Sequence, residues 1–113
     1  MAYKRLLLEI GMGNDLHGGD YTKAATRAVL DAVHHSSMTM VRTLELDRDS
    51  LRIDITIGVQ QPDKVDADAV KTALRAANVT VTAVKGGLDI LDEDADDLAV
   101  IATAAVEVML PRP

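Results

Sequence analysis

The 113-residue chain contains no cysteine, no phenylalanine and no tryptophan, and it has only two tyrosines. Without cysteine it can form no disulfide framework, no thiolate metal site and no cysteine nucleophile, which agrees with a cytoplasmic protein. Because 48% of the residues are hydrophobic but almost none is aromatic, the core must be built from Val, Ile, Leu, Ala and Met. Small side chains of this kind favour close packing of helices on a sheet.

Long hydrophobic runs and an excess of positive charge are absent as well. The first apolar run, from Leu6 to Leu8, is interrupted by Glu9, so we expect neither a signal peptide nor a membrane span of about 20 residues. The 12 Lys and Arg residues are outnumbered by 18 Asp and Glu residues, and the net charge is −6. Nucleic acid is therefore not an expected partner, because phosphate binding needs clustered basic side chains. The length predicts a single domain, residues 1–113.

Five β-strands and two helices are predicted from the hydrophobic pattern. Strands are indicated by alternating or continuous apolar residues between turn residues, at 5–10, 39–46, 51–59, 79–84 and 98–110. Asp20 and Asp66 stand where the N-caps of two helices belong, and the second helix is expected to run through Ala76. The strands at 39–46 and 51–59 should form a hairpin with a four-residue loop.

The order of these elements, β-α-β-β-α-β-β, predicts an α/β domain of the α+β type. It is the ferredoxin-like, split βαβ pattern with one extra strand, a two-layer fold with both helices on one face of a mixed sheet. The acidic run from Asp89 to Asp97 is interpreted as a solvated hairpin loop. The other sheet face would have no helix, although the strand from Leu98 to Leu110 is apolar on both sides. Such a patch usually marks an interface, so we expect a homo-oligomer, with a trimer favoured.

The stretch from Leu6 to Ser37 carries the strongest indication of a functional site. It is predicted to pass from the buried first strand through a glycine-rich loop into the first helix, and the loop holds Gly11, Gly13, Gly18 and Gly19. Successive helical residues lie 100° apart, which places five polar side chains on one stripe: Asp20, Lys23, Arg27, Asp31 and His34. Asp15 and His17 should lie at the same end as the helix start.

An anion or carbonyl site is the kind of site that this stretch best predicts. Lys23 and Arg27 lie one turn apart, behind backbone N–H groups at a helix start, which suits a carboxylate or a polarised carbonyl oxygen. Arg27 would bind the ligand in a forked manner, and Lys23 would act as a point charge or a base. The candidate catalytic residues are Lys23, Arg27 and His34, and the candidate ligand-binding residues are Gly11, Gly13, Asp15, His17, Gly18, Gly86 and Gly87.

Nucleotide and metal sites are weighed beside this one. The segment GMGNDLHGG lacks the third glycine spacing of a dinucleotide fingerprint and the Gly-Lys-Ser/Thr of a P-loop, so no nucleotide and no other cofactor is expected. Metal ligands of the types that suit zinc or manganese are supplied by Glu9, Asp15, His17, His34 and His35. Their spacing matches no tight metal motif, so no metal ligand is assigned, and a divalent-metal-binding protein stays an alternative.

The segment GMGNDLHGGDYTKAATRAVLDAVHH, together with Gly86-Gly87-Leu88 and the closing TAAVEV, resembles a small family of conserved hypothetical proteins of bacteria and plants. The resemblance covers nearly the whole chain, and the family has no established function. Its expected fold resembles the chorismate-mutase-like and Rid-type trimers, and the ring-opening amidohydrolases that act on cyanuric acid and barbiturate resemble it in architecture. The resemblance implies that Lys23 and Arg27 match the basic pair of those amidohydrolases. Lys85, however, stands before Gly86 where those enzymes have a serine nucleophile.

Two functions of different classes follow from these observations. The first is an oligomeric enzyme or ligand-binding domain for a small polar or cyclic carbonyl compound, held at a subunit interface by Lys23, Arg27, His34 and loop residues. The second is a structural or accessory subunit whose polar stripe is only solvated. The two hypotheses differ in whether the stripe lies in a cleft between subunits or on an open helix surface.

Overall fold

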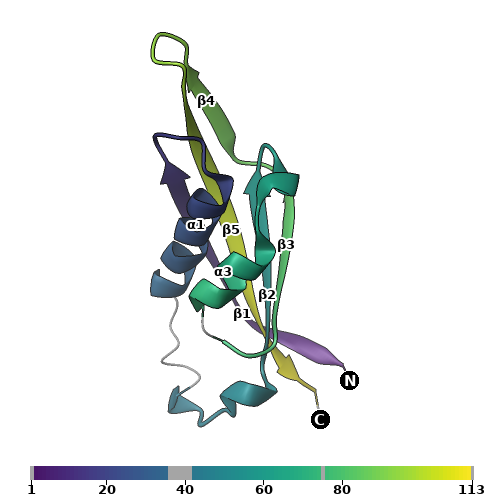
Figure 1. Ribbon diagram of the computed structural model, residues 1–113. Coiled ribbons are helices and arrows are strands. Elements are labelled where there is room, and N and C mark those ends of the chain that lie inside the picture. The colour runs from purple at the N-terminus through teal and green to yellow at the C-terminus, as the bar shows by residue number, and fades with distance from the viewer. Residues whose placement is uncertain (1, 36–41, 75, 113) are drawn as a thin grey trace.

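The computed structural model describes residues 2–35, 42–74 and 76–112, and these form one mixed sheet with helices on one of its faces. The strands are β1 (Tyr3–Asp15), β2 (Arg52–Val59), β3 (Val79–Lys85), β4 (Leu88–Asp92) and β5 (Asp97–Pro111). The helices are α1 (Tyr21–His35) and α3 (Ala67–Leu74), with short 3-10 helices η1 (Arg48–Ser50) and η2 (Pro62–Lys64) in the loops. Figure 1 shows α1 and α3 side by side on the same face of the sheet. The predicted α+β class is confirmed.

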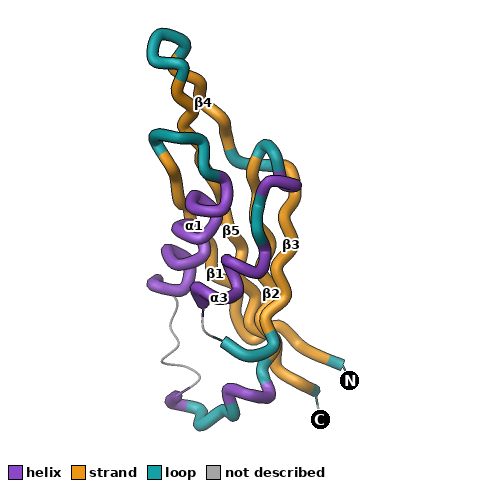
Figure 2. The backbone as a smooth tube through the Cα atoms, in the orientation of Figure 1, coloured by secondary structure: helices purple, strands orange, loops and turns teal. Residues whose placement is uncertain are grey.

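The long strand β5 is the centre of the sheet. It pairs antiparallel with β1 along one side and with β2 and β4 along the other, while β3 lies outside β2 and runs parallel to it. Figure 2 shows β4 and the start of β5 extending beyond the rest of the sheet as a projecting hairpin. The molecule is consequently elongated, with extents of 56 × 24 × 20 Å. No helix of the described ranges is long and apolar enough to cross a membrane.

Two predicted elements differ from the structure. Residues 39–41 of the expected strand at 39–46 lie outside the described residues, but Arg42 and Thr43 are helical and are followed by a turn. Because β5 and β3 occupy both sides of β2, no position remains beside β2 for a hairpin partner. The acidic run is not a single loop, since β4 pairs with β5 and only residues 93–96 form the turn. The elements labelled in Figure 1 therefore follow the order β-α-β-α-β-β-β.

Both helices begin at the predicted caps. The Asp20 carboxylate accepts a hydrogen bond from the Lys23 N–H at 3.0 Å. The Asp66 carboxylate accepts from the N–H groups of Asp68 and Ala69 at 3.1 and 3.2 Å. Each cap satisfies backbone donors that have no partner inside the first turn of a helix.

The helix α1 lies unusually close to β1 because two glycines face it. A Cβ atom added to Gly11 would lie 2.8 Å from Ala32 Cα, and one added to Gly13 would lie 2.6 Å from the Ala24 carbonyl oxygen. The helix face that meets them carries fully buried alanines, among them Ala28. Gly11 and Gly13 were predicted in a loop, but they are strand residues whose missing side chains allow the close approach of the helix.

The opposite face of the sheet carries exposed apolar side chains and no described helix. Five of them lie on β1 and β4, and we call this surface the open face: Leu8, Ile10, Met12, Leu88 and Ile90. The register pairs Ile10 with Ala105 and Leu88 with Ile101, so the two outer strands present these side chains on the same side of β5. Ile10 is 69% exposed and Met12 is 60% exposed. The prediction of an uncovered apolar sheet face is therefore confirmed by the described residues.

Candidate functional site

The loop between β1 and α1 is held against β5 by groups of the chain itself. The Gly18 N–H donates to Asp97 Oδ1 at 2.9 Å, and His17 Nδ1 lies 2.8 Å from Asp97 Oδ2. The Gly19 N–H donates to the Leu98 carbonyl oxygen at 3.1 Å. The Gly18 N–H and the His17 ring lower the pKa of the Asp97 carboxyl below its usual value. The loop amides that were expected to bind a ligand anion thus already have acceptors within the protein.

Asp15 is a buried carboxylate at the start of α1. Only 4% of its surface is exposed, and its Oδ2 accepts a hydrogen bond from the Asp20 N–H at 2.9 Å. Its Oδ1 lies 3.8 Å from Lys23 Nζ, so Lys23 balances the buried charge. Because the carboxylates of Asp15 and Asp20 already occupy the helix start, an incoming anion would meet negative charge there.

The second half of the polar stripe contacts the free edge of β1. Arg27 Nη1 donates to the Asn14 carbonyl oxygen at 2.8 Å, and Asp31 Oδ2 accepts from the Met12 N–H at 2.9 Å. These backbone groups point away from β5, and an edge strand has no second neighbour to satisfy them. Arg27 and Asp31 therefore take the place that a further strand would otherwise fill.

A hollow of about 530 Å³ lies between α1 and this edge of β1. It is lined by Met12, Gly13, Asn14, Arg27, Leu30, Asp31 and His34. The structure thus brings two of the three predicted catalytic residues, Arg27 and His34, to one concave surface, whereas Lys23 lies outside its lining. Met12 belongs both to the hollow and to the open face, so the hollow adjoins the apolar surface of the sheet.

Gly86 and Gly87, predicted as ligand-binding residues, lie at the crossing from β3 to β4 and do not line the hollow. The Gly86 N–H donates to the Val59 carbonyl oxygen at 2.9 Å, and Gln60 Nε2 donates to the carbonyl oxygens of both glycines at 3.1 and 3.2 Å. A Cβ atom at Gly87 would collide with the Ile101 carbonyl group, and its φ is 61°. The structure thus accounts for the two glycines by close packing of the backbone.

Among the described side chains, the histidines and carboxylates weighed as metal ligands do not gather. Within residues 2–35, 42–74 and 76–112, no group of three or more His, Asp or Glu side chains could hold a metal ion. His17 is hydrogen-bonded to Asp97, Asp15 pairs with Lys23, and His34 lines the hollow. Glu9 lies further back on β1.

A polar cluster that the sequence did not predict surrounds Tyr21, the first residue of α1. Its side chain is 4% exposed, and its hydroxyl group donates to Asp89 Oδ2 and accepts from Gln61 Nε2 at 2.8 Å. Burial and the Asp89 carboxylate raise the pKa of Tyr21. The second oxygen of Asp89, Oδ1, is buried and has no hydrogen-bond partner among the described residues. The one available signal was that Asp89 alternates with Leu88 and Ile90, as a strand residue would.

Fold and site together define a small α+β protein with an uncovered apolar sheet face and a polar hollow beside it. The chain belongs to the family described as "Conserved hypothetical protein (Lin0512_fam)", whose model matches residues 5–108. The predicted membership of a family of conserved hypothetical proteins is thus confirmed, while kinship with the amidohydrolases and Rid-type trimers stays a prediction.

One solved structure is similar to this chain in fold and in sequence. It is the crystal structure of an FtsZ-like protein of unknown function from Nostoc punctiforme PCC 73102, which shares 32% sequence identity with this chain. The match covers 99% of this chain and 99% of that chain, with a TM-score of 0.86. No curated protein matches the sequence.

Proposed function

We propose that this protein is a homo-oligomer that binds a small cyclic imide, ureide or carboxylate in the hollow between α1 and β1, at the boundary between two subunits. The observation that supports this proposal is the position of Met12, which lines the hollow and also lies on the open face. A second subunit seated on the open face would cover the hollow from that side. Ligand binding and assembly would then depend on each other.

Assembly is supported by the apolar surface itself. Leu8, Ile10, Met12, Leu88 and Ile90 are each between 41% and 69% exposed on one face of one sheet. Full burial of such a side chain stabilises by about 1.5–3 kcal/mol, so covering the exposed half of each contributes about 1 kcal/mol. Five such side chains contribute about 5 kcal/mol from each subunit toward the cost of association, and we favour a trimer.

Ligand binding is supported by the groups that meet at the hollow. A guanidinium has five N–H donors, and the contact of Arg27 with the Asn14 carbonyl uses one of them. The remaining donors suit a carbonyl or carboxylate oxygen, and the Asp31 carboxylate in the same hollow suits a neighbouring ligand N–H. A ring in which C=O and N–H alternate matches this pair better than a simple carboxylate does. His34 would add a further hydrogen-bonding group.

Light scattering on purified protein tests the assembly. The wild type should be an oligomer at micromolar concentration, and Ile10→Glu should be a monomer because it places a charge at the centre of the open face. Leu44→Glu is the matched control, since Leu44 is 57% exposed in the loop before η1. A monomeric wild type, or an Ile10→Glu protein that keeps the mass of the wild type, would contradict the proposal.

Calorimetric titration with cyclic imides, ureides and small carboxylates tests the site. Arg27→Lys keeps the positive charge but loses the planar guanidinium that can donate two parallel hydrogen bonds. The binding free energy of a compound should therefore weaken by about 1–3 kcal/mol. Arg5→Lys is the control, because Arg5 pairs with Glu107 and does not line the hollow. Ile10→Glu should weaken the binding of the same compound if a second subunit covers the site. Equal affinity for the wild type and Arg27→Lys would place the compound elsewhere.

A structural or accessory subunit is the second candidate, and one observation favours it. Lys23, Arg27 and Asp31 each have a contact within the protein that accounts for their place on the stripe. If none of the tested compounds binds while the wild type is oligomeric, this second function replaces ligand binding.

A further inference from the structure

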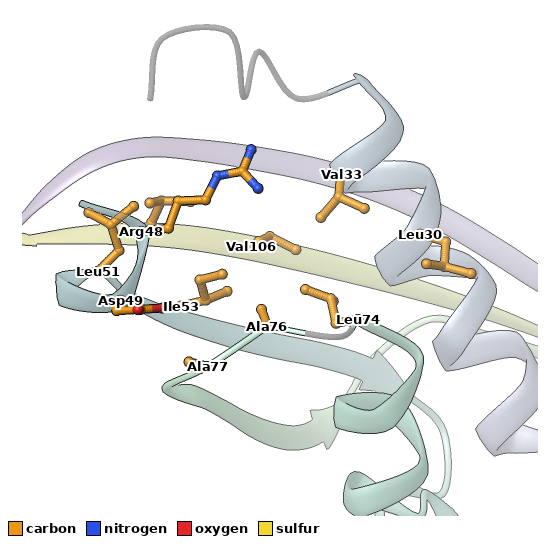
Figure 3. A pocket seen from close by; sticks show the side chains of 11 residues that line it. Leu30, Val33, Arg48, Asp49, Leu51, Ile53, Leu74, Ala76, Ala77 and Val106 are labelled. Carbon is orange, nitrogen blue, oxygen red and sulfur yellow. The ribbon is translucent and has the colours of Figure 1, made fainter. Parts of the chain in front are cut away.

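A second cavity lies between the helices and the sheet, and Leu30 lines both this cavity and the hollow. Its volume is about 410 Å³, within the range of about 300–1,000 Å³ that is common for small-molecule sites. Figure 3 shows the side chains around it, with Val106 in the middle of the view, Val33 above it to the right and Ile53 below it. We propose that this cavity binds an amphipathic monocarboxylate, with an acyl chain or ring inside and its carboxylate on Arg48.

The apolar part of the ligand is indicated by the lining. Val106 and Val108 of β5 and Ile53 of β2 form the sheet side, and their partners across the cavity are also aliphatic. The cavity lies between the main core, which contains Val106, and a smaller cluster formed by Leu51 and Val108. Most of the lining is apolar, so an apolar group is the favoured occupant of the part away from Arg48 and Asp49.

The carboxylate is indicated by Arg48, a cation among the described residues of the lining. Figure 3 shows its side chain extending along the rim from η1, with the guanidinium on the side of Val33 and Val106. No described residue forms a hydrogen bond or an ion pair with this guanidinium. Its five donors therefore suit a forked contact with a carboxylate at the mouth of an apolar cavity.

The position of Arg48 is held by the backbone around it. Asp47 caps η1 by accepting a hydrogen bond from the Asp49 N–H at 3.0 Å, and Asn78 Nδ2 donates to the Asp49 carbonyl oxygen at 2.9 Å. These contacts fix the turn from which Arg48 projects, which lowers the ordering cost of binding. The Asp49 side chain also lines the cavity, so a second anionic group on the ligand would be repelled.

Three compounds with the same chain and different head groups test the proposal: decanoate, decanol and decyltrimethylammonium. The two charged compounds are titrated into the wild-type protein below their micelle concentrations and decanol below its solubility limit. Methyl NMR spectra report shifts of Ile53, Val106 and Val108. Decanoate should bind at least about tenfold more tightly than decanol, and the cation should bind most weakly. Shifts in these three residues should accompany binding.

Matched substitutions separate the charge from the cavity. Arg48→Gln should weaken the binding of decanoate about tenfold and leave the binding of decanol unchanged. Lys71→Gln, on the exposed part of α3, should change neither affinity. Ala76→Leu fills the cavity and should weaken both compounds, whereas Ala69→Leu adds the same atoms on the exposed side of α3. Val33→Phe is a second filling variant in case Ala76→Leu does not fold, which circular dichroism reports.

Three results would overturn the proposal. The first is no binding of decanoate to the wild type at millimolar concentration. The second is equal affinity of decanoate and decanol, which would remove the role of Arg48. The third is unchanged binding in a folded cavity-filling variant, which would move the compound to another surface, such as the open face.

Discussion

Replacing Gly11 with alanine should push α1 away from β1 and destabilise the protein by about 3 kcal/mol or more. The new Cβ atom would lie 2.8 Å from Ala32 Cα, and closer still to the Ala28 carbonyl oxygen, whereas ordinary contact begins at 3.4 Å. The obstructing atoms belong to the helix backbone, so no side-chain rotation can make room. The helix as a whole must move by at least about half an ångström.

The magnitude follows from what this movement does to the core. Between α1 and the sheet, Ala24, Ala25, Ala28 and Val29 are at most 1% exposed. A gap of about 0.5–1 Å loses about a quarter to a half of the dispersion energy at each contact. Overpacking a core typically costs about 1–3 kcal/mol, and a collision with rigid backbone belongs at the top of that range or above it. At about 4 °C for each kcal/mol, the melting temperature should fall by about 12 °C.

Urea unfolding followed by circular dichroism, at one fixed protein concentration, measures this change. Gly18→Ala is the control: its φ of 97° strains an alanine, but the nearest atom to a Cβ there is Asp15 Oδ2 at 3.8 Å. The control should therefore lose only about 1–2 kcal/mol. If Gly11→Ala unfolds at the same urea concentration as the wild type, with the same slope, the close contact between α1 and β1 does not exist in solution.

Two further predictions concern pH. Burial and Asp89 raise the pKa of Tyr21, so the stability that Tyr21 contributes should be complete below about pH 10 and lost as the pH rises through and above that value. Tyr21→Phe should abolish this alkaline loss of stability. At neutral pH it should lower the free energy of unfolding by about 1–3 kcal/mol, because its hydrogen bonds are lost. A variant that loses stability at alkaline pH as the wild type does would contradict this prediction. Gly18 and His17 lower the pKa of Asp97, so its contribution should be complete above about pH 4 and lost as the pH falls through the lowered pKa. Asp97→Asn should melt below the wild type at neutral pH and approach it in acid, and a constant difference across the pH range would refute the assignment.

The polar stripe of α1 was predictable, but its contacts were not. The 3.6-residue repeat is enough to place Arg27 and Asp31 on one side of a helix that starts after Asp20. Their partners, the Asn14 carbonyl and the Met12 N–H, belong to a part of β1 that the glycine pattern predicts as a loop. The reading failed because glycines in a strand look like loop glycines until the helix that packs on them is seen.

The prediction that the glycines bind a ligand depended on the same ambiguity between strand, turn and loop glycines. Gly18 is a turn residue with positive φ, as expected. Gly86 and Gly87 instead allow close packing of the backbone where the chain passes from β3 to β4. The sequence predicts Asp97 in a solvated acidic run, but its carboxylate accepts a hydrogen bond from the loop before α1. A single sequence does not report such contacts, since Gly18 and Asp97 are far apart in the chain.

The sequence by itself determined the α+β class, both helix caps, the extent of β2 and β3, and the apolar character of both faces of β5. All of these depend on residues within a few positions of one another, where periodicity and capping act. The tertiary structure decided that β3 and β5 occupy both sides of β2, that β4 pairs with the start of β5, and that α1 lies on the glycines of β1. Strand pairing and the space beside a glycine depend on segments that are distant in the chain, so no local pattern encodes them.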